Sequence, residues 1–455
     1  MRDTMTRIRL DDSLGELDGL RNEILTWVSA TRRHDADDRH GDHLQAIEEV
    51  TTAALLGVRE WLLDQTTGRA QGEVYTECRR ADLRVVRIRR FWRWYADRLD
   101  QYARSPHAGT LAAADEIVRS SWHEVFTAAG GADVPPVPLT AVADVDVPTA
   151  LARAEVPWEL KAPADEMVAT WTARMPIATI TLPVAVLTRP WWLILAVHEA
   201  GHHVHAELFR AGDAVDSLVT AAEQAVDRAG AGREERTRWA RWSAELFADA
   251  FAVVLAGSAP AWSVAELELA DDDTLLAPGP STGRYPPPLV RWLLADAVAS
   301  RLGVADPVTG TRARLLDRHP RARDLVSLGT GVAEALLDLP LGTTCLRRIG
   351  LATAGWQQTA LSWRQALLAR AEPLPRRRPE SARLCAAGGT LAWFVLAADP
   401  EGPAPDRIAT VNRRMLELVP RCGPTRVRTS APAAIAKGIA AAAESVLADL
   451  RSDSW

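Results

Sequence analysis

The sequence predicts a mainly α-helical fold that contains one small β-sheet, an α+β arrangement. Apolar residues recur three and four positions apart over long stretches, which is the pattern of helices with one buried face. One short segment instead alternates apolar and polar residues, as a half-buried strand does. Clusters of proline and glycine separate these stretches. A chain of 455 residues is expected to form two or three domains.

The N-terminal part is predicted to be a helical region over residues 1–130, because helical spacing of apolar residues persists there. Residues 131–157 are predicted to be a linker or an extended wrap, since five prolines stand among small residues. A core is expected at 158–300. A second helical region, interrupted by further Pro and Gly clusters, is expected at 301–455.

The segment 177–187 is the predicted strand, because apolar residues alternate there with threonines. Pro183 interrupts this run. A proline has no backbone N–H to donate to a neighbouring strand. We therefore predict that this strand lies at an edge of its sheet.

Three helices are predicted after the strand. Pro190 suits the first turn of a helix, which is expected to continue to about residue 211 and is apolar on nearly every side up to residue 197. A second helix is predicted at 214–229. The third is predicted at 233–256, and Gly257 is expected to end it.

Charge and cysteine content limit the expected partners and compartment. The formal net charge of -6 and the pI near 6.0 give no general attraction to nucleic acid or anionic lipid. Seven arginines within 79–93 are interpreted as a solvated or salt-bridged helix face. The four cysteines form no CxxC pair, and the N-terminus lacks the apolar stretch of a signal peptide. Prolines and an arginine interrupt the longest apolar region, 177–197. We expect a cytoplasmic protein without a membrane anchor or a nucleic-acid partner.

Residues 198–202 form the metal-binding pattern HExxH on the first of the three helices. His198 and His202 are one helical turn apart on one face, so both imidazoles can bind one tetrahedral ion. Glu199 is rotated by about 100 degrees from His198, which lets it stand beside the metal and act on water. This spacing predicts a zinc site with Glu199 as general base.

A catalytic zinc ion needs a third protein ligand and an open position. Glu245 and Asp249 lie one turn apart where the helix 233–256 becomes apolar. Two carboxylates entering a core are costly to bury unless a cation or hydrogen bonds receive them. Glu245 can therefore be the third ligand, and Asp249 can accept a hydrogen bond from a ligating histidine.

Together these motifs resemble the gluzincin group of zinc metallopeptidases, in which HExxH on one helix is joined by ExxxD on a following helix. The resemblance implies that Zn²⁺ is bound by His198, His202 and Glu245. It implies further that Glu199 deprotonates the water nucleophile and that Asp249 orients a histidine.

The resemblance covers residues 177–257 and implies a zincin-like metallopeptidase core within 158–300. It also implies that a peptide or protein substrate pairs with the edge strand before the active helix, where 177–187 is expected. One departure is length, because forty-two residues separate His202 from Glu245, more than in the compact members of the group.

The sequence also offers further candidate site residues and alternative functions. Tyr285, and less so Arg291, are nominated as donors to the oxyanion because they accompany a rigid proline segment. His205 is a minor alternative ligand, and His203 is predicted to be a packing or hydrogen-bonding residue. The zinc can instead be structural, in a helical interaction protein, or can serve a hydrolase that does not cleave peptides. The helical flanks can also receive a regulatory partner.

Overall fold

The structure, a computed structural model, describes residues 2–35, 39–104, 107–130, 134–153, 155–161, 166–209, 214–262, 270–277, 283–304, 311–352, 355–371, 378–399, 401–402, 404–423 and 432–451. Most of these residues are helical. The described strands form one three-stranded mixed sheet and one two-stranded hairpin. The predicted fold class, mainly α with a small sheet, is confirmed.

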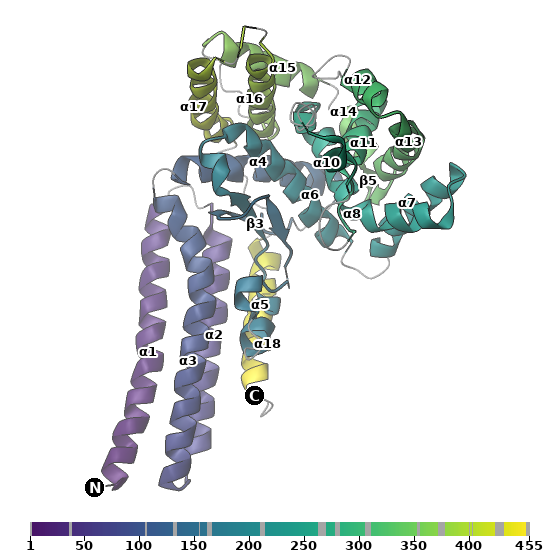
Figure 1. The fold of residues 1–455 in the computed structure, drawn as a ribbon. Coiled ribbons are helices and arrows are strands. Elements are labelled where there is room, and N and C mark those ends of the chain that lie inside the picture. The colour runs from purple at the N-terminus through teal and green to yellow at the C-terminus, as the bar shows by residue number, and fades with distance from the viewer. Residues whose placement is uncertain are drawn as a thin grey trace.

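Three long helices near the N-terminus form a bundle that extends away from the rest of the molecule (Figure 1). They are α1 (Arg2–His34), α2 (Gly41–Thr66) and α3 (Gln71–Leu99). The last helix, α18 (Pro432–Arg451), returns to this bundle and lies along α2, with α5 (Glu166–Arg174) beside it. Segments from both ends of the chain therefore share one hydrophobic core.

The three-stranded sheet has the order β1-β3-β2. Its strands are β1 (Leu139–Ala143), β2 (Thr149–Leu151) and β3 (Thr179–Pro183). β1 runs parallel to β3, and β2 runs antiparallel to it. The sheet connects two parts of the molecule, because β1 contacts α3 and α4 whereas β2 and β3 contact α6.

The predicted edge position of the strand 177–187 is wrong, because β3 is the central strand. Pro183 is tolerated because it is the last residue of β3. Its missing backbone N–H removes only one donor, at the end of the strand. The chain after it forms a 3₁₀ helix over Val184–Leu187. The segment 131–157, predicted to be a linker, contains both partner strands, β1 and β2.

The helices that carry the metal-binding motifs pack directly against each other. A 3₁₀ turn over Pro190–Ile194 leads into α6 (Leu195–Leu208), and α7 (Ala214–Arg228) follows. α8 spans Arg233–Ala256, as predicted, and ends at Gly257, whose φ of 66° is a left-handed value that glycine adopts without strain. Residue 211, the predicted end of the first helix, lies outside the described residues.

The remaining helices surround α6 and α8 (Figure 1). They are α4 (His107–Ala128), α10 (Asp272–Leu276), α11 (Pro288–Arg301), α12 (Thr311–Arg318), α13 (Arg323–Leu337), α14 (Leu346–Ala352), α15 (Trp356–Leu368), α16 (Ser381–Ala397) and α17 (Pro405–Cys422). The hairpin pairs β4 (Pro340–Leu341) with β5 (Thr344–Cys345). Further 3₁₀ helices cover Asp100–Ala103, Trp158–Leu160, Ala259–Trp262 and Pro320–Ala322.

A second, larger core joins α4, α6, α8, α11, α13 and α16. The predicted division of the chain at residues 130, 157 and 300 stays a prediction. Among the described helices, none is both long enough and apolar enough to span a bilayer.

Candidate metal centre

The helix α6 is held against the sheet by its own histidine, His203. This side chain is buried, and its Nε2 donates to the backbone carbonyl of Thr179 in β3 over 3.0 Å. Burial lowers the pKa of His203 to about 3, so the ring is neutral and keeps one nitrogen as an acceptor. His203 is therefore a hydrogen-bonding and packing residue, as the sequence predicts.

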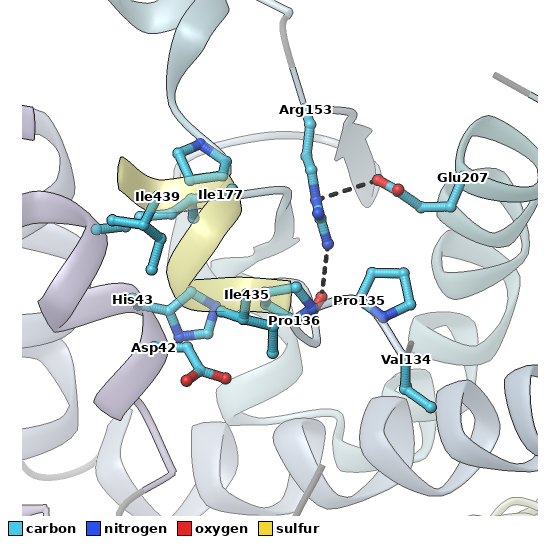
Figure 2. A pocket seen from close by; sticks show the side chains of 13 residues that line it. Asp42, His43, Val134, Pro135, Pro136, Arg153, Ile177, Glu207, Ile435 and Ile439 are labelled. Atoms are coloured by element: carbon cyan, nitrogen blue, oxygen red, sulfur yellow. Dashed lines mark hydrogen bonds and ion pairs between the residues drawn. The ribbon is translucent and has the colours of Figure 1, made fainter. Parts of the chain in front are cut away.

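The C-terminal end of α6 is fixed by an ion pair next to a small cavity (Figure 2). Arg153, just after β2, lies with its Nε 3.1 Å from Oε1 of Glu207 and donates through Nη2 to the carbonyl of Pro136 over 3.0 Å. The cavity beside this pair has a volume of about 200 Å³ and is also lined by His43 and by Ile439 of α18. None of the HExxH residues lines this cavity. It lies where the sheet, the bundle and α6 meet.

The opposite face of α6 packs closely on α8 because residue 201 is glycine. A Cβ atom at Gly201 would lie 3.0 Å from Cα of Ala248 and 3.2 Å from Cδ1 of Phe251. This close approach places one turn of α6 directly across from Glu245 and Asp249, which precede and follow Ala248 on α8. Helix packing thus brings together residues that are far apart in the sequence.

His198, His202 and Glu245 form a group that can hold a metal ion, with one donor atom from each lying within 4.8 Å of the others. The two histidine Nε2 atoms are 3.1 Å apart. Glu245 places Oε2 3.4 Å from His198 Nε2 and Oε1 3.5 Å from His202 Nε2. Ligands bound about 2.0–2.1 Å from one tetrahedral zinc ion lie about 3.3 Å apart, so this donor set fits zinc.

Asp249 and Arg291 support the first of these ligands. Asp249 Oδ1 lies 3.0 Å from His198 Nδ1, on the side of the ring opposite the metal-facing nitrogen. Arg291, from the first turn of α11, donates through Nε and Nη2 to both oxygens of Asp249 at 2.8 and 2.7 Å. Arg291 is predicted from the sequence as a candidate oxyanion donor. In the structure its guanidinium group instead donates to Asp249. No sequence spacing indicates this pair.

The charged residues of this group shift one another's pKa values. Burial alone lowers the pKa of His198, but hydrogen bonds to Asp249 and Glu245 outweigh it and raise that pKa to about 9. Burial alone raises the pKa of Glu245, yet its contacts with His198 and His202 hold that pKa well below its usual range. Burial acts the same way on Asp249, and Arg291 lowers its pKa to about 2. The carboxylates are therefore ionised and able to receive a cation.

Glu199 follows His198 on α6, and Tyr285 lies in the segment before α11. Glu199 is buried, and it is not part of the ligand group. Tyr285, in the segment before α11, is 48% exposed. Partial burial raises the pKa of Tyr285, and the negative charges of Glu245 and Glu199 raise it further. The phenol of Tyr285 is therefore neutral at neutral pH.

His205, the minor alternative ligand, does not join the group. Its ring packs against Phe209 and Phe247, with centroid distances of 5.1 and 5.7 Å. Burial, and to a lesser extent the neighbouring His202, lower the pKa of His205 to about 4. This histidine is a packing residue.

Comparison with models of protein families, with curated proteins and with solved structures finds no match to this chain.

Proposed function

We propose that this chain is a zinc-dependent hydrolase that cleaves peptide bonds. The observation that carries the proposal is the donor set of His198, His202 and Glu245. The two Nε2 atoms are 3.1 Å apart, and the Glu245 carboxylate places Oε2 3.4 Å from the first and Oε1 3.5 Å from the second, which suits one tetrahedral ion. Three protein donors in the described residues leave one position for water or substrate. A closed structural site needs four protein ligands, so this count favours catalysis.

The chemistry that zinc supplies in such a site is Lewis acidity together with a lowered pKa of water. His198, His202 and Glu245 hold the ion, and Asp249 keeps the His198 ring in the orientation that presents Nε2. Glu199 takes a proton from the water nucleophile and later passes it to the leaving amine. The phenol of Tyr285 is the candidate donor to the developing oxyanion.

A peptide is the proposed substrate because α6, which carries two of the candidate ligands, packs against a sheet that has an unpaired edge. In the order β1-β3-β2, β2 has one side without a strand partner among the described residues, and it packs against α6. An extended polypeptide can add to such an edge through backbone hydrogen bonds. β2 takes the role that the sequence assigned to the segment 177–187.

The test combines metal analysis with an unbiased cleavage assay. The full-length protein is analysed for bound zinc, then stripped with a chelator and reconstituted. Each form is incubated with a pool of peptides, and new termini are detected by mass spectrometry. We expect stoichiometric zinc, and cleavage that the chelator abolishes and zinc restores.

Parallel assays with ester and epoxide substrates separate the alternatives. Hydrolysis of these substrates without peptide cleavage would make the protein a different zinc hydrolase. Bound zinc without any hydrolysis would indicate a structural site, and absence of zinc binding would remove the proposal as a whole.

A further inference from the structure

One face of α8 carries a row of charged residues that includes the candidate metal ligand Glu245. Glu234, Arg238, Arg241, Glu245 and Asp249 follow one another at intervals of four, three, four and four positions. This spacing places them on one side of a helix. The C-terminal half of the row belongs to the metal centre. The N-terminal half contains two arginines that the proposed chemistry does not use.

A groove of about 780 Å³ runs beside the N-terminal half of this row. Its charged lining residues are Arg233, Glu234, Arg238 and Arg241, and Trp242, Leu276 and Pro287 add apolar surface. Arg241 is one turn before Glu245, which corresponds to about 6 Å along the helix axis. Pro287, on another wall, directly precedes α11, the helix that carries Arg291. The groove therefore adjoins the elements that carry the metal centre.

The groove is cationic although the chain as a whole is acidic. Arg238 is paired with Glu234 at 2.9 Å and with Glu235 at 2.6 Å. Arg233 and Arg241 are exposed, and within the described part of the chain neither has a carboxylate partner. The whole chain carries a formal net charge of -6, so these unpaired guanidinium groups form a local exception.

We propose that this groove binds an acidic stretch of the substrate polypeptide and directs the adjoining peptide bond to the metal centre. This inference rests on the proposed function and adds a substrate class to it. Exposed arginines attract carboxylates and favour them over neutral side chains. Leu276 and Pro287 add apolar wall, so the preferred segment mixes acidic with apolar residues. Nucleic acid is a poorer fit, because Trp242 is only 3% exposed and offers no ring face for stacking.

Binding is tested apart from cleavage, using full-length, zinc-loaded Glu199→Gln protein as a form that should bind without turnover. The probes are two fluorescent peptides of equal length, one rich in glutamate and leucine, the other with glutamine at every glutamate. We expect the acidic peptide to bind more tightly and to lose affinity as salt rises. The double variant Arg233→Glu/Arg241→Glu, made in the same background, should weaken its binding about tenfold.

The matched control is Arg21→Glu/Arg79→Glu, the same change of charge at two exposed positions, one on α1 and one on α3. It should leave peptide binding unchanged. Equal binding of both peptides, or equal effects of the control and the groove variant, would overturn the groove assignment. So would a groove variant that loses affinity for single-stranded DNA while its affinity for acidic peptide stays the same.

The outcomes also separate this inference from the proposed function. If wild type cleaves neutral and acidic peptides with equal kcat/KM, the peptidase stands and the acidic preference is wrong. If the acidic peptide binds in the groove but wild type never cleaves it, the groove stands and the peptidase is wrong.

Discussion

Arg291 donates two parallel hydrogen bonds to Asp249, with 2.8 Å between Nε and Oδ2 and 2.7 Å between Nη2 and Oδ1. The same carboxylate lies 3.0 Å from Nδ1 of His198. A residue of α11 therefore orients a candidate ligand on α6 by way of a residue of α8. The orientation of the His198 ring depends on the packing of three helices.

Replacing Arg291 should weaken both stability and zinc affinity. Arg291→Gln leaves the Asp249 carboxylate, which is 12% exposed, without its guanidinium partner, and we expect this to cost about 1–3 kcal/mol of unfolding free energy. Arg291→Lys keeps the charge but loses the paired geometry, so its effect should be intermediate. Denaturant unfolding and zinc competition with a chelator measure the two quantities. Wild-type values for Arg291→Gln would show that the ion pair is unimportant.

Substitution of a candidate ligand should lower zinc affinity more than substitution of the residue that supports it. His198→Ala, His202→Ala and Glu245→Ala should each abolish stoichiometric zinc, because each removes a donor atom. Asp249→Ala removes only the support of a ligand and should weaken zinc by roughly 10- to 100-fold. His205→Ala is the control on the same helix and should retain zinc. If Asp249→Ala is more damaging than Glu245→Ala, the two roles are interchanged.

Local patterns in the sequence predict the elements of this site well. The apolar periodicity and Gly257 predict the full extent of α8, and the HExxH spacing identifies one face of α6. Both signals are local, because helical hydrogen bonds join residues four apart. Glu245 could be chosen because a carboxylate that enters an apolar helix segment requires a partner.

Long-range pairings are the part that the sequence does not reveal. β3 is central because β1, about forty residues earlier, pairs with one side of it and β2 with the other. Prolines around these short strands make their segment resemble a linker. The return of α18 to α2 and the contact of Arg291 with Asp249 likewise depend on packing between distant helices.

Stability should fall between neutral and alkaline pH because of His40. This buried histidine lies between Asp35 and Asp115, with Nε2 3.2 Å from Asp115 Oδ2. Burial alone lowers the pKa of His40, but the two carboxylates outweigh it and raise the pKa from 6.5 to about 9. The folded state thus binds this proton more tightly than the unfolded state.

The stabilisation from His40 is therefore complete below pH about 6.5 and is lost as pH rises through about 9. His40→Gln should be less stable than wild type at pH 6.5 and should lack this decline. Denaturant unfolding of both proteins across this pH range provides the comparison. Parallel pH profiles would show that His40 does not hold its proton in the folded state.

Gly201→Ala should separate α6 from α8. The added methyl group would lie 3.0 Å from Cα of Ala248, so the helices must move apart by a few tenths of an ångström. We expect a loss of about 1–3 kcal/mol in unfolding free energy and weaker zinc binding, because the donors on the two helices diverge. The control is Gly19→Ala in α1, where the new methyl group meets nothing within 4 Å. Alanine there should be neutral or stabilising, since it favours helix.

Glu199→Gln distinguishes an enzyme from a metal-bound scaffold. Glutamine keeps the size of this buried side chain but cannot accept the proton of the water nucleophile. Because Glu199 lies outside the ligand group of His198, His202 and Glu245, zinc content and melting temperature should stay at their wild-type values. Cleavage of a peptide identified in the pooled digest should fall by about 100- to 10,000-fold, the usual contribution of a positioned general base.

The matched control for this variant is Glu207→Gln, the same change on the same helix, at a residue that pairs with Arg153 instead of facing the metal centre. It removes a carboxylate from α6 without removing the proposed base, so turnover should stay close to wild type even if stability declines slightly. Zinc content, melting temperature and kcat are measured for the three proteins side by side. Full activity of Glu199→Gln would eliminate the proposed proton transfer. Loss of zinc from Glu199→Gln alone would instead mean that Glu199 helps to hold the ion, since the control shows what removal of a carboxylate from this helix does by itself.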